Sequence, residues 1–459
     1  MVARICLAAF LALTARLACG EEEGKWKPIY SSDPGVVQQL DALGDSSAVV
    51  LPTKVSGLEG GWEKNDWLRT GPFTRAYCVK MAYASDRRTA FYCGQDHNLP
   101  HYNDCWEFHL GSATWYCLSN PDGGNCAIIW RDLAQKIWGK KPETDTGKLE
   151  KARTQVVQWM QDNVTLENGY LQTRKNGGPV LAWHTWDALT YDPRVGRMFW
   201  VVLDDQETQF GYLRTYCQAV GKDFQEESKK LKPGTGMWSF DPGTRKWARW
   251  TGEAPHARMR GMGGSFHYLP DLKKMVWYCA AENVSPAEFG MWSYDAVADR
   301  WEELKPNGGK AIRELVHADK VAPGDEFQVA YSPKHRKLVA VQKRDTFVYD
   351  VAANAWSKAG TEEGNYASDC RTVFAYDSTS DVFLLYNAPK GEWDDARNLR
   401  AFDLKTGKWE TLTPQGAALP KGVRKGYYDP EHNVLVLADQ GPIWVYRYRK
   451  GLLGGRATS

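Results

Sequence analysis

The stretch FDLKTGKW at positions 402–409 shows a pattern that recurs along the chain. An aromatic residue is followed by a tryptophan seven positions later, and Gly, Asp, Asn or Lys residues lie between the two. Segments of this composition form tight turns between antiparallel strands, and an Asp can bond to its own backbone there. The pattern therefore predicts a strand, a turn and a returning strand at five places: 108–115, 240–247, 294–301, 349–356 and 402–409.

A second pattern alternates with the first. It consists of a tyrosine, a short polar turn and an apolar run of β-forming residues, and it begins at Tyr83, Tyr191, Tyr268, Tyr331, Tyr376 and Tyr428. One copy of each pattern makes a four-stranded antiparallel sheet, whose strands we name a to d in chain order. Such a sheet cannot bury both faces alone, but six in a ring bury them against one another, with aromatic side chains between. We therefore predict an all-β, six-bladed β-propeller.

The last blade lacks its fourth strand, because no tryptophan follows the run at 444–446 within seven positions. The missing piece is expected at the other end of the chain. GKWKP at 24–28 is similar to GKW at 407–409, so we expect residues 24–28 to pair with the strand around Trp444. This N-terminal strand would close the ring and remove two open sheet edges.

With these repeats, residues 24–449 resemble the kelch and galactose-oxidase-like propeller family. The family's Gly-Gly pair after strand b is reduced here to Gly94, which marks a divergent member. Copper oxidases of this family hold the metal with two Tyr and two His residues. The adjacent Tyr-His pair of that site is missing here, so we expect no cofactor.

Two segments interrupt the repeats. Residues 118–178 carry apolar residues at helical spacing, such as Val156, Trp159 and Met160 within 147–163, and 126–138 show the same spacing. We predict a helical insertion there after blade 1; the alternative is a seventh blade in this gap. Residues 31–70 form a second, N-terminal insertion before blade 1.

The first twenty residues have the features of a signal peptide. Arg4 precedes a short apolar run, and small residues at 18–20 offer a cleavage site. The mature chain of 21–459 is then expected to be secreted or periplasmic; acylation at Cys19 is the alternative. No later stretch is long and apolar enough to span a membrane.

Eight cysteines remain after the leader, an even number in an exported chain, which favours disulfides. We expect Cys78–Cys93 and Cys105–Cys117 from their symmetry about two hairpins, with Cys93–Cys105 as a competing pair. Cys126 and Cys217 form a further candidate pair.

The charge of the mature chain is balanced. The chain has 58 basic and 56 acidic side chains, and the leader holds two of the arginines. Because there is no basic block, the composition argues against nucleic acid and anionic membranes as partners. We expect a monomer.

The connections from strand d to the next strand a share one face with the b–c loops. Both insertions and the long loop at 204–236 lie on that face, and elaborated loops commonly carry function. We expect a ligand there, bound by groups from at least three blades, whereas the opposite face of short turns should be inert. The candidate ligand-binding residues are Arg75, His97, His184, Trp186, Asp204, Arg260, Glu282 and Arg371; Asp104 and Asp187 lie on the same face.

Each candidate also has a structural interpretation. His184 and Trp186 suit either a sugar-stacking platform or the packed start of blade 2. The arginines could bind a carboxylate or hold neighbouring blades together. His97 and His101, with Asp104, have the residue types of a metal site but also of an exposed loop, and we predict no metal.

These features predict an exported binding or scaffold propeller for a saccharide, a glycoconjugate or an extracytoplasmic protein. The mixture of cations, acids and aromatic residues favours a polar saccharide, with acidic saccharides among the candidates, over an apolar ligand. The alternative is an enzyme, a lyase or hydrolase acting on a carbohydrate or, less in keeping with the residues, a copper oxidase. No catalytic residue can be named from the sequence.

Overall fold

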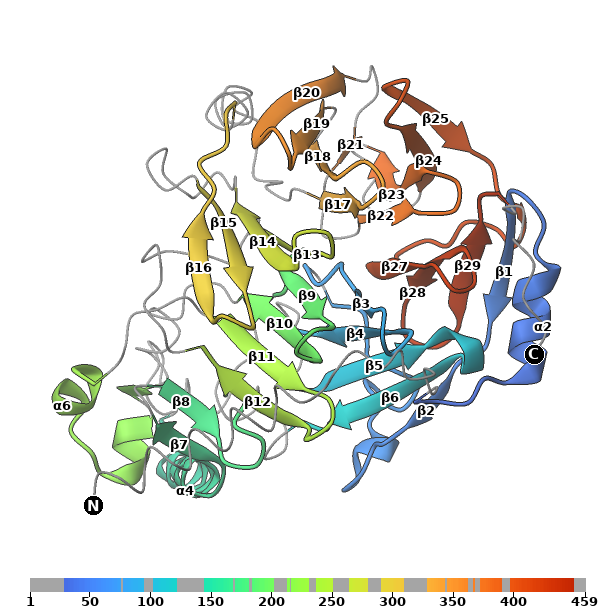
Figure 1. The fold of residues 1–459 in the computed structure, drawn as a ribbon. Coiled ribbons are helices and arrows are strands. Elements are labelled where there is room, and N and C mark those ends of the chain that lie inside the picture. Colours follow the sequence, from blue (N-terminus) through green and yellow to red (C-terminus); the bar gives the residue numbers. More distant parts are fainter. Residues whose placement is uncertain are drawn as a thin grey trace, which may run out of the picture. The chain divides into compact units, whose positions relative to one another are not determined.

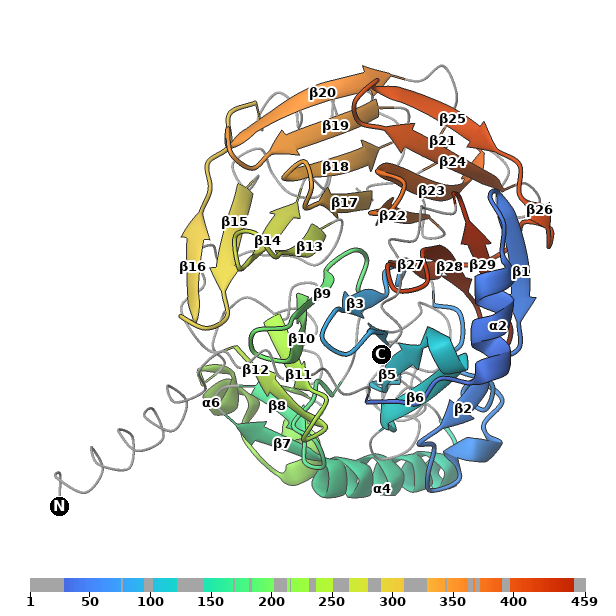
Figure 2. The same ribbon diagram turned by 45° about the vertical axis from the view of Figure 1, so that its right-hand side comes forward.

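The computed structural model confirms a six-bladed propeller, and Figures 1 and 2 show its sheets arranged in a ring. The structure describes these residues: 29–75, 77–94, 102–121, 144–167, 170–180, 184–201, 213–214, 216–230, 237–250, 264–279, 290–308, 328–342, 345–361, 366–367, 372–389 and 397–449.

Each blade is a mainly antiparallel sheet of four strands in the order a to d. Blade 1 holds β3 (Ala82–Ala84), β4 (Thr89–Cys93), β5 (Cys105–His109) and β6 (Thr114–Ser119). Blade 2 holds β9 (Leu189–Asp192), β10 (Arg197–Val201), β11 (Met237–Asp241) and β12 (Lys246–Arg249). Blade 3 holds β13 (Gly264–Leu269), β14 (Lys274–Cys279), β15 (Gly290–Asp295) and β16 (Arg300–Glu303).

Blades 4 to 6 repeat this order. Blade 4 holds β17 (Gln328–Ser332), β18 (Lys337–Gln342), β19 (Asp345–Asp350) and β20 (Ala355–Thr361). Blade 5 holds β22 (Val373–Asp377), β23 (Val382–Pro389), β24 (Asn398–Asp403) and β25 (Lys408–Leu412), with β21 (Tyr366–Ala367) beside β23. Blade 6 holds β27 (Lys425–Asp429), β28 (Val434–Ala438), β29 (Ile443–Arg447) and β1 (Ser47–Leu51), with β26 (Gln415–Gly416) beside β1.

The spacing of seven residues has a direct structural meaning. In five blades the aromatic residue on strand c is the register partner of the tryptophan on strand d, as in Tyr294 opposite Trp301 and Phe402 opposite Trp409. The paired rings of these two hairpins have centroids 4.8 and 5.0 Å apart. Cross-strand aromatic pairs stabilise a hairpin and fix its register. The other three pairs are Phe108–Trp115, Phe240–Trp247 and Tyr349–Trp356.

The a–b and c–d turns are held by side chains of the repeat itself. The Asp after the aromatic residue accepts backbone N–H groups of its own turn, as Asp377 does from Thr379 and Ser380 at 3.0 and 2.8 Å. Five positions after the aromatic residue the backbone adopts positive φ, which Asn and Asp tolerate. The aromatic hydroxyl donates to that side chain in four turns: Tyr294 to Asp299, Tyr349 to Asn354, Tyr376 to Asp381 and Tyr428 to Asn433.

An N-terminal strand closes the ring, but it is not the segment expected from the sequence. β1 at 47–51 pairs antiparallel with β29, with Val50 opposite Trp444. The expected strand at 24–28 lies outside the described residues, and its place beside β29 belongs to β1. The next segment, β2 (Lys54–Ser56), pairs parallel with β6 of blade 1. Part of the segment 31–70 therefore spans the boundary between blades 6 and 1, which we call the seam.

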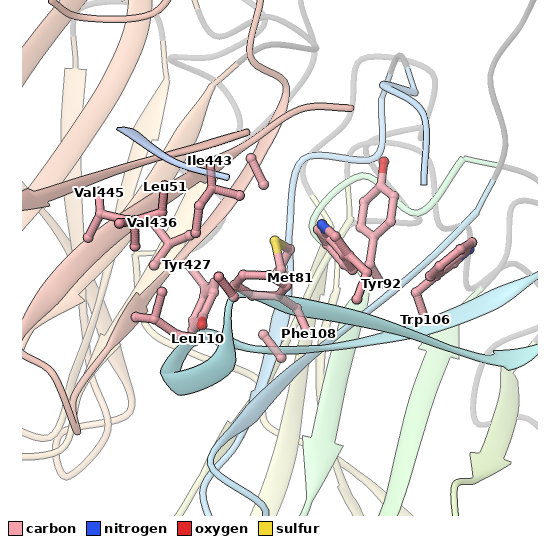
Figure 3. Packing of buried hydrophobic residues seen from close by; sticks show 14 of the residues in the cluster. Leu51, Met81, Tyr92, Trp106, Phe108, Leu110, Tyr427, Val436, Ile443 and Val445 are labelled. Carbon is pink, nitrogen blue, oxygen red and sulfur yellow. The ribbon is translucent and has the colours of Figure 1, made fainter. Parts of the chain in front are cut away.

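A hydrophobic cluster fills the seam. Figure 3 shows Leu51, Ile443 and Val445 of blade 6 beside Leu110 and Phe108 of blade 1. Helix α2 (Pro34–Ala42) adds Val36 and Leu40 to the same cluster. Short 3₁₀ turns, η1 (Trp62–Lys64) and η2 (Leu110–Ser112), complete this region. The seam is therefore a packed core as well as a strand pairing.

The helical insertion after blade 1 is present. Helix α4 (Thr146–Asn163) begins at the Asp145 cap and is followed by the hairpin of β7 (Val164–Glu167) and β8 (Tyr170–Thr173). Its predicted apolar residues Val156, Trp159 and Met160 are buried, and they share a cluster with Leu171 of β8 and with Leu213, Tyr216, Cys217 and Ala219. A short helix, α6 (Phe224–Ser228), lies in the b–c connection of blade 2. The second expected helix, at 126–138, lies outside the described residues.

The expected disulfides do not form among the described cysteines. Cys78, Cys93, Cys105, Cys117 and Cys217 are buried thiols. An irregularity between Cys105 and Trp106 shifts the register, so Cys117 lies opposite Trp106 rather than Cys105. Cys78 precedes strand β3 and is not opposed to Cys93. The competing pair Cys93 and Cys105 lies in register on β4 and β5, without a bond; Cys126 lies outside the described residues.

The signal peptide at 1–20 also lies outside the described residues and stays a prediction. Among the helices that the structure describes, none has the length and apolar character needed to cross a membrane.

Candidate functional site

The six inner strands, β3, β9, β13, β17, β22 and β27, all begin at the same end of the ring. Parallel bridges join Lys80 to Gly426 and Asp187 to Ser265 at these beginnings, so the first residues of neighbouring blades lie side by side. We call this the start end, and we call the opposite end, which carries the a–b and c–d turns, the turn end. The loops expected to carry function leave the strands at the start end.

Three polar side chains from different blades meet at the start end. Lys80 precedes β3 of blade 1, Asp187 precedes β9 of blade 2, and His267 lies on β13 of blade 3. His267 Nε2 lies 2.8 Å from Asp187 Oδ2, and Lys80 Nζ lies 3.2 Å from His267 Nδ1 and 3.1 Å from His267 Nε2. Lys80 also donates to the Phe266 carbonyl at 2.8 Å. We call these three side chains the lysine–histidine–aspartate cluster.

Burial and the neighbouring charges shift the pKa values of this cluster. Burial lowers the pKa of Lys80 to about 8, although the nearby Asp187 carboxylate opposes the shift. Burial and the Lys80 charge lower the pKa of His267, so the imidazole is neutral near pH 7. A neutral imidazole carries one N–H, and Nε2 can donate it to the Asp187 carboxylate, while the Lys80 amine contacts both ring nitrogens. A lysine, a neutral histidine and a carboxylate in contact can bind a polar group or pass a proton.

A second polar centre lies nearby, between blades 6 and 1. Arg75 and Asp104 form an ion pair at 2.6 Å, and both side chains are fully buried. Lys425, the first residue of β27, is also fully buried. It donates to the Pro72 carbonyl at 2.8 Å, and its amine lies 4.9 Å from the centre of the Tyr92 ring. Two cations and one carboxylate therefore share a largely aromatic surrounding, which we call the arginine–lysine centre.

Burial affects the charges of this centre in different ways. Desolvation lowers the pKa of Lys425 to about 7, and the charges of Asp439 and Asp104 oppose this shift only in part. The pKa of Arg75 is raised despite its burial, because Asp104 stabilises the guanidinium charge. Burial also raises the pKa of Tyr92 well above its ordinary value, so its hydroxyl stays protonated.

Several buried polar atoms at the start end lack a hydrogen-bond partner in the described part of the chain. Gln328 begins β17, and its Nε2 has none, although the residue is 3% exposed. Asn387, near the end of β23, has neither side-chain atom paired at 1% exposure. Buried polar groups are normally satisfied, so such groups indicate a place for water or a ligand. Further unpaired atoms at this end are Thr185 Oγ1, Tyr92 Oη, Asp104 Oδ1 and Arg75 Nε.

The structure places three of the expected site residues. Arg75 forms its ion pair with Asp104 of its own blade. His184 and Trp186 are 2% and 5% exposed, and their rings contact one another and Tyr77, as at a packed start of blade 2. A ligand-binding role for them stays a prediction. The other expected residues, His97, Asp204, Arg260, Glu282 and Arg371, lie outside the described residues.

Sequence reasoning missed Lys80, His267, Gln328 and Lys425. They lie at or near the first residues of inner strands, a position that every blade supplies, and this was the available signal. Among the described residues, no three His, Cys, Asp or Glu side chains lie close enough together to hold a metal ion. His97 and His101, considered above as ligands, lie outside those residues.

No family model matches the chain, and no curated protein matches it. The resemblance to the kelch and galactose-oxidase-like family therefore stays a prediction. Among solved structures, an auxiliary nutrient binding protein from Bacteroides ovatus is similar to this chain at 9% sequence identity. The match covers 87% of this chain and 76% of that chain, with a TM-score of 0.43.

Proposed function

We propose that this protein is a binding propeller that takes a polar, acidic saccharide at the start end. The observation that carries this proposal is the set of buried and unpaired polar groups there, above all Gln328 Nε2 and the Asn387 amide. An unpaired buried polar group costs about 1–3 kcal/mol, and a ligand that supplies its partner removes that cost. The proposed role includes export, as the leader at 1–20 predicts.

The chemistry of the groups supports a saccharide. Gln328 Nε2 can only donate, whereas the Asn387 amide can donate and accept. Sugar hydroxyls do both, so one ligand can satisfy both kinds of group. Lys80, whose side chain is 16% exposed, supplies a cation for an acidic substituent. Groups of the first five blades contribute: Lys80, Asp187, His267, Gln328 and Asn387.

A second candidate function is catalysis on a carbohydrate, of the lyase or hydrolase type. The lysine–histidine–aspartate cluster favours it, because Lys80 has a pKa of about 8 and touches a neutral histidine. A general acid or base works best when its pKa lies near the working pH. Binding remains the main proposal because the unpaired groups Gln328 and Asn387 lie outside this cluster.

The test is a screen of neutral, uronate-containing and sulfated oligosaccharides by thermal shift, followed by calorimetry. We expect an acidic saccharide to bind. Gln328→Met keeps the side-chain volume and removes the unpaired amide, so it should leave stability unchanged or raised. It should weaken binding by about 1–3 kcal/mol, roughly 5- to 150-fold.

The matched control is Ser332→Ala, at the other end of the same strand β17. Ser332 is buried but accepts its hydrogen bond within its own turn, so its loss should leave affinity unchanged. Failure of every saccharide to bind, or equal binding by Gln328→Met and the wild type, contradicts the proposal. If the wild type forms cleavage products that are absent with Lys80→Met, catalysis is the function of this site and the binding proposal is wrong.

A further inference from the structure

A cavity of about 450 Å³ opens at the turn end, between blades 5 and 6. Its walls are the a–b turn of blade 5 at 380–382, the c–d hairpin of blade 5 at 401–410, and Tyr448 and Arg449 after β29. Its volume lies within the range of small-molecule sites. The short turns of this end were predicted to be inert, and the proposed function does not use them.

The carboxylates of this cavity are already occupied by the protein. Asp381 receives His335 Nε2 at 2.7 Å, Lys334 Nζ at 2.8 Å and Lys405 Nζ at 3.1 Å. The two lysines outnumber the Asp381 carboxylate by one charge, so this group is cationic. Glu410 accepts the Tyr448 hydroxyl.

The remaining carboxylate, Asp403, accepts the backbone N–H of Lys405 at 2.8 Å, so it too is engaged in holding its turn. Each lining carboxylate thus already accepts a hydrogen bond or an ion pair from the protein.

Two cations of the cavity have no such partner. Lys408 and Arg449 form no ion pair with any residue that the structure describes, although both line the cavity. Arg449 is nevertheless held in place, because its Nη2 donates to the Tyr448 hydroxyl at 3.0 Å and its guanidinium carbon lies 4.8 Å from that ring centre. Side chains oriented before binding lose less entropy when a ligand arrives. The cavity thus offers one positioned cation, Arg449, and a second cation, Lys408, on its wall.

The geometry points to a second binding site in this cavity, for a ligand that carries an oxyanion. Lys408 and Arg449 pair with the phosphate, sulfate or carboxylate group, and Lys405, fixed by Asp381, lies beside them. Arg presents parallel N–H groups that match such oxyanions. The volume leaves room for a group of sugar size behind the oxyanion.

The test measures binding of four probes to the mature protein by calorimetry: inorganic phosphate, inorganic sulfate, glucose 6-phosphate and galacturonate. We expect at least one to bind, more weakly as salt is raised. The double variant Lys408→Gln/Arg449→Gln should lose about tenfold or more in affinity, because it removes two charge-assisted contacts. Both residues are exposed, so the fold should not change. Tighter binding of the sugar anions assigns a saccharide, and equal binding assigns the free oxyanion.

The matched control is Arg300→Gln. Arg300 occupies the position of Lys408 in blade 3, since each pairs in register with the Asp of its hairpin, Asp295 or Asp403. This variant should bind the probes as the wild type does. The inference fails if no probe binds, or if the double variant binds equally well. It also fails if Gln328→Met abolishes anion binding while the double variant keeps it, because the anion then sits at the start end.

Discussion

The turn end and the start end of this propeller are built from the same six sheets but differ in how their polar side chains are paired. At the turn end, a side-chain hydrogen bond or ion pair bridges every boundary between neighbouring blades. The bridges are Tyr191 to Asp86, Arg194 to Asp295, Tyr331 to Asp271, His335 to Asp381, Tyr428 to Thr379 and Arg88 to Glu431. At the start end, by contrast, Gln328 and Asn387 keep unpaired polar atoms in burial.

This difference distinguishes polar contacts made by residues of the repeated sequence pattern from those made by residues outside it. Residues of the repeat take part in four of these bridges, through the tyrosines Tyr191, Tyr331 and Tyr428 and the aspartate Asp295. At the start end, the polar residues at or near the first positions of the inner strands differ in type from blade to blade, as Lys80, Asp187 and Gln328 do. Three substitutions test this contrast, beginning with the one of largest expected effect.

Arg75→Met should be the most damaging of the three. It leaves the Asp104 carboxylate at 0% exposure without its cation, and removing one partner of a buried pair costs about 3–5 kcal/mol. Urea unfolding followed by tryptophan fluorescence measures the loss. The double variant Arg75→Met/Asp104→Leu should recover most of it, because no buried charge is left. A loss below about 1 kcal/mol in the single variant would show that water reaches this centre.

Lys425→Met should stabilise the protein, and more so at low pH. Burial lowers the pKa of Lys425 from 10.5 to about 7, so between these values the unfolded chain binds more protons than the folded one. The wild type therefore gains stability as pH rises through this window. The variant lacks this cost and should gain about 1–4 kcal/mol at pH 6 and least near pH 10.

Melting curves at several pH values measure this effect. The matched control is Lys64→Met, at an exposed lysine, which should give no such pH dependence. A gain from Lys425→Met that stays constant from pH 6 to pH 10 would contradict the assignment of a desolvated amine.

Glu431→Gln should have the smallest effect. It removes the turn-end ion pair with Arg88, whose side chains are 39% and 26% exposed, and solvent screens such pairs. We expect a loss of about 0.5 kcal/mol that disappears in about 1 M salt. Unfolding in low and high salt measures it. A loss above about 2 kcal/mol at both salt concentrations would mean that single turn-end bridges stabilise the ring far more than exposed ion pairs do.

The blades could be predicted because their signals are local. Tyr294 and Trp301, seven positions apart, face each other across one turn, so the two residues that make the sequence pattern also make the contact. The position of the closing strand could not be predicted in this way. GKWKP at 24–28 matches the repeat, whereas SAVVL at 47–51 carries no tryptophan and is recognised only once β29 lies beside it.

The candidate site escaped prediction for a related reason. Lys80 lies 107 residues from Asp187 and 187 from His267, and no local pattern joins them. Their meeting follows from ring geometry, which brings the beginnings of the inner strands together. The predicted disulfide between Cys105 and Cys117 was wrong because the strand register shifts by one residue after Cys105. Cys117 therefore lies opposite Trp106.

The seam has a consequence for the order in which the protein is made. The Leu43 carbonyl accepts a hydrogen bond from Arg447, which lies 404 residues later in the chain. Strand β1 likewise pairs with β29, which is synthesised near the end of the chain. At a synthesis rate of about 5–20 residues per second, that interval lasts roughly 20–80 s. During this time β1 is an unpaired strand, and unpaired strands are prone to pair with other chains. Strand β1 is therefore synthesised first but is among the last strands of the ring to pair. Until Arg447 has been synthesised, a chaperone bound to the chain would have to keep β1 from pairing with other chains.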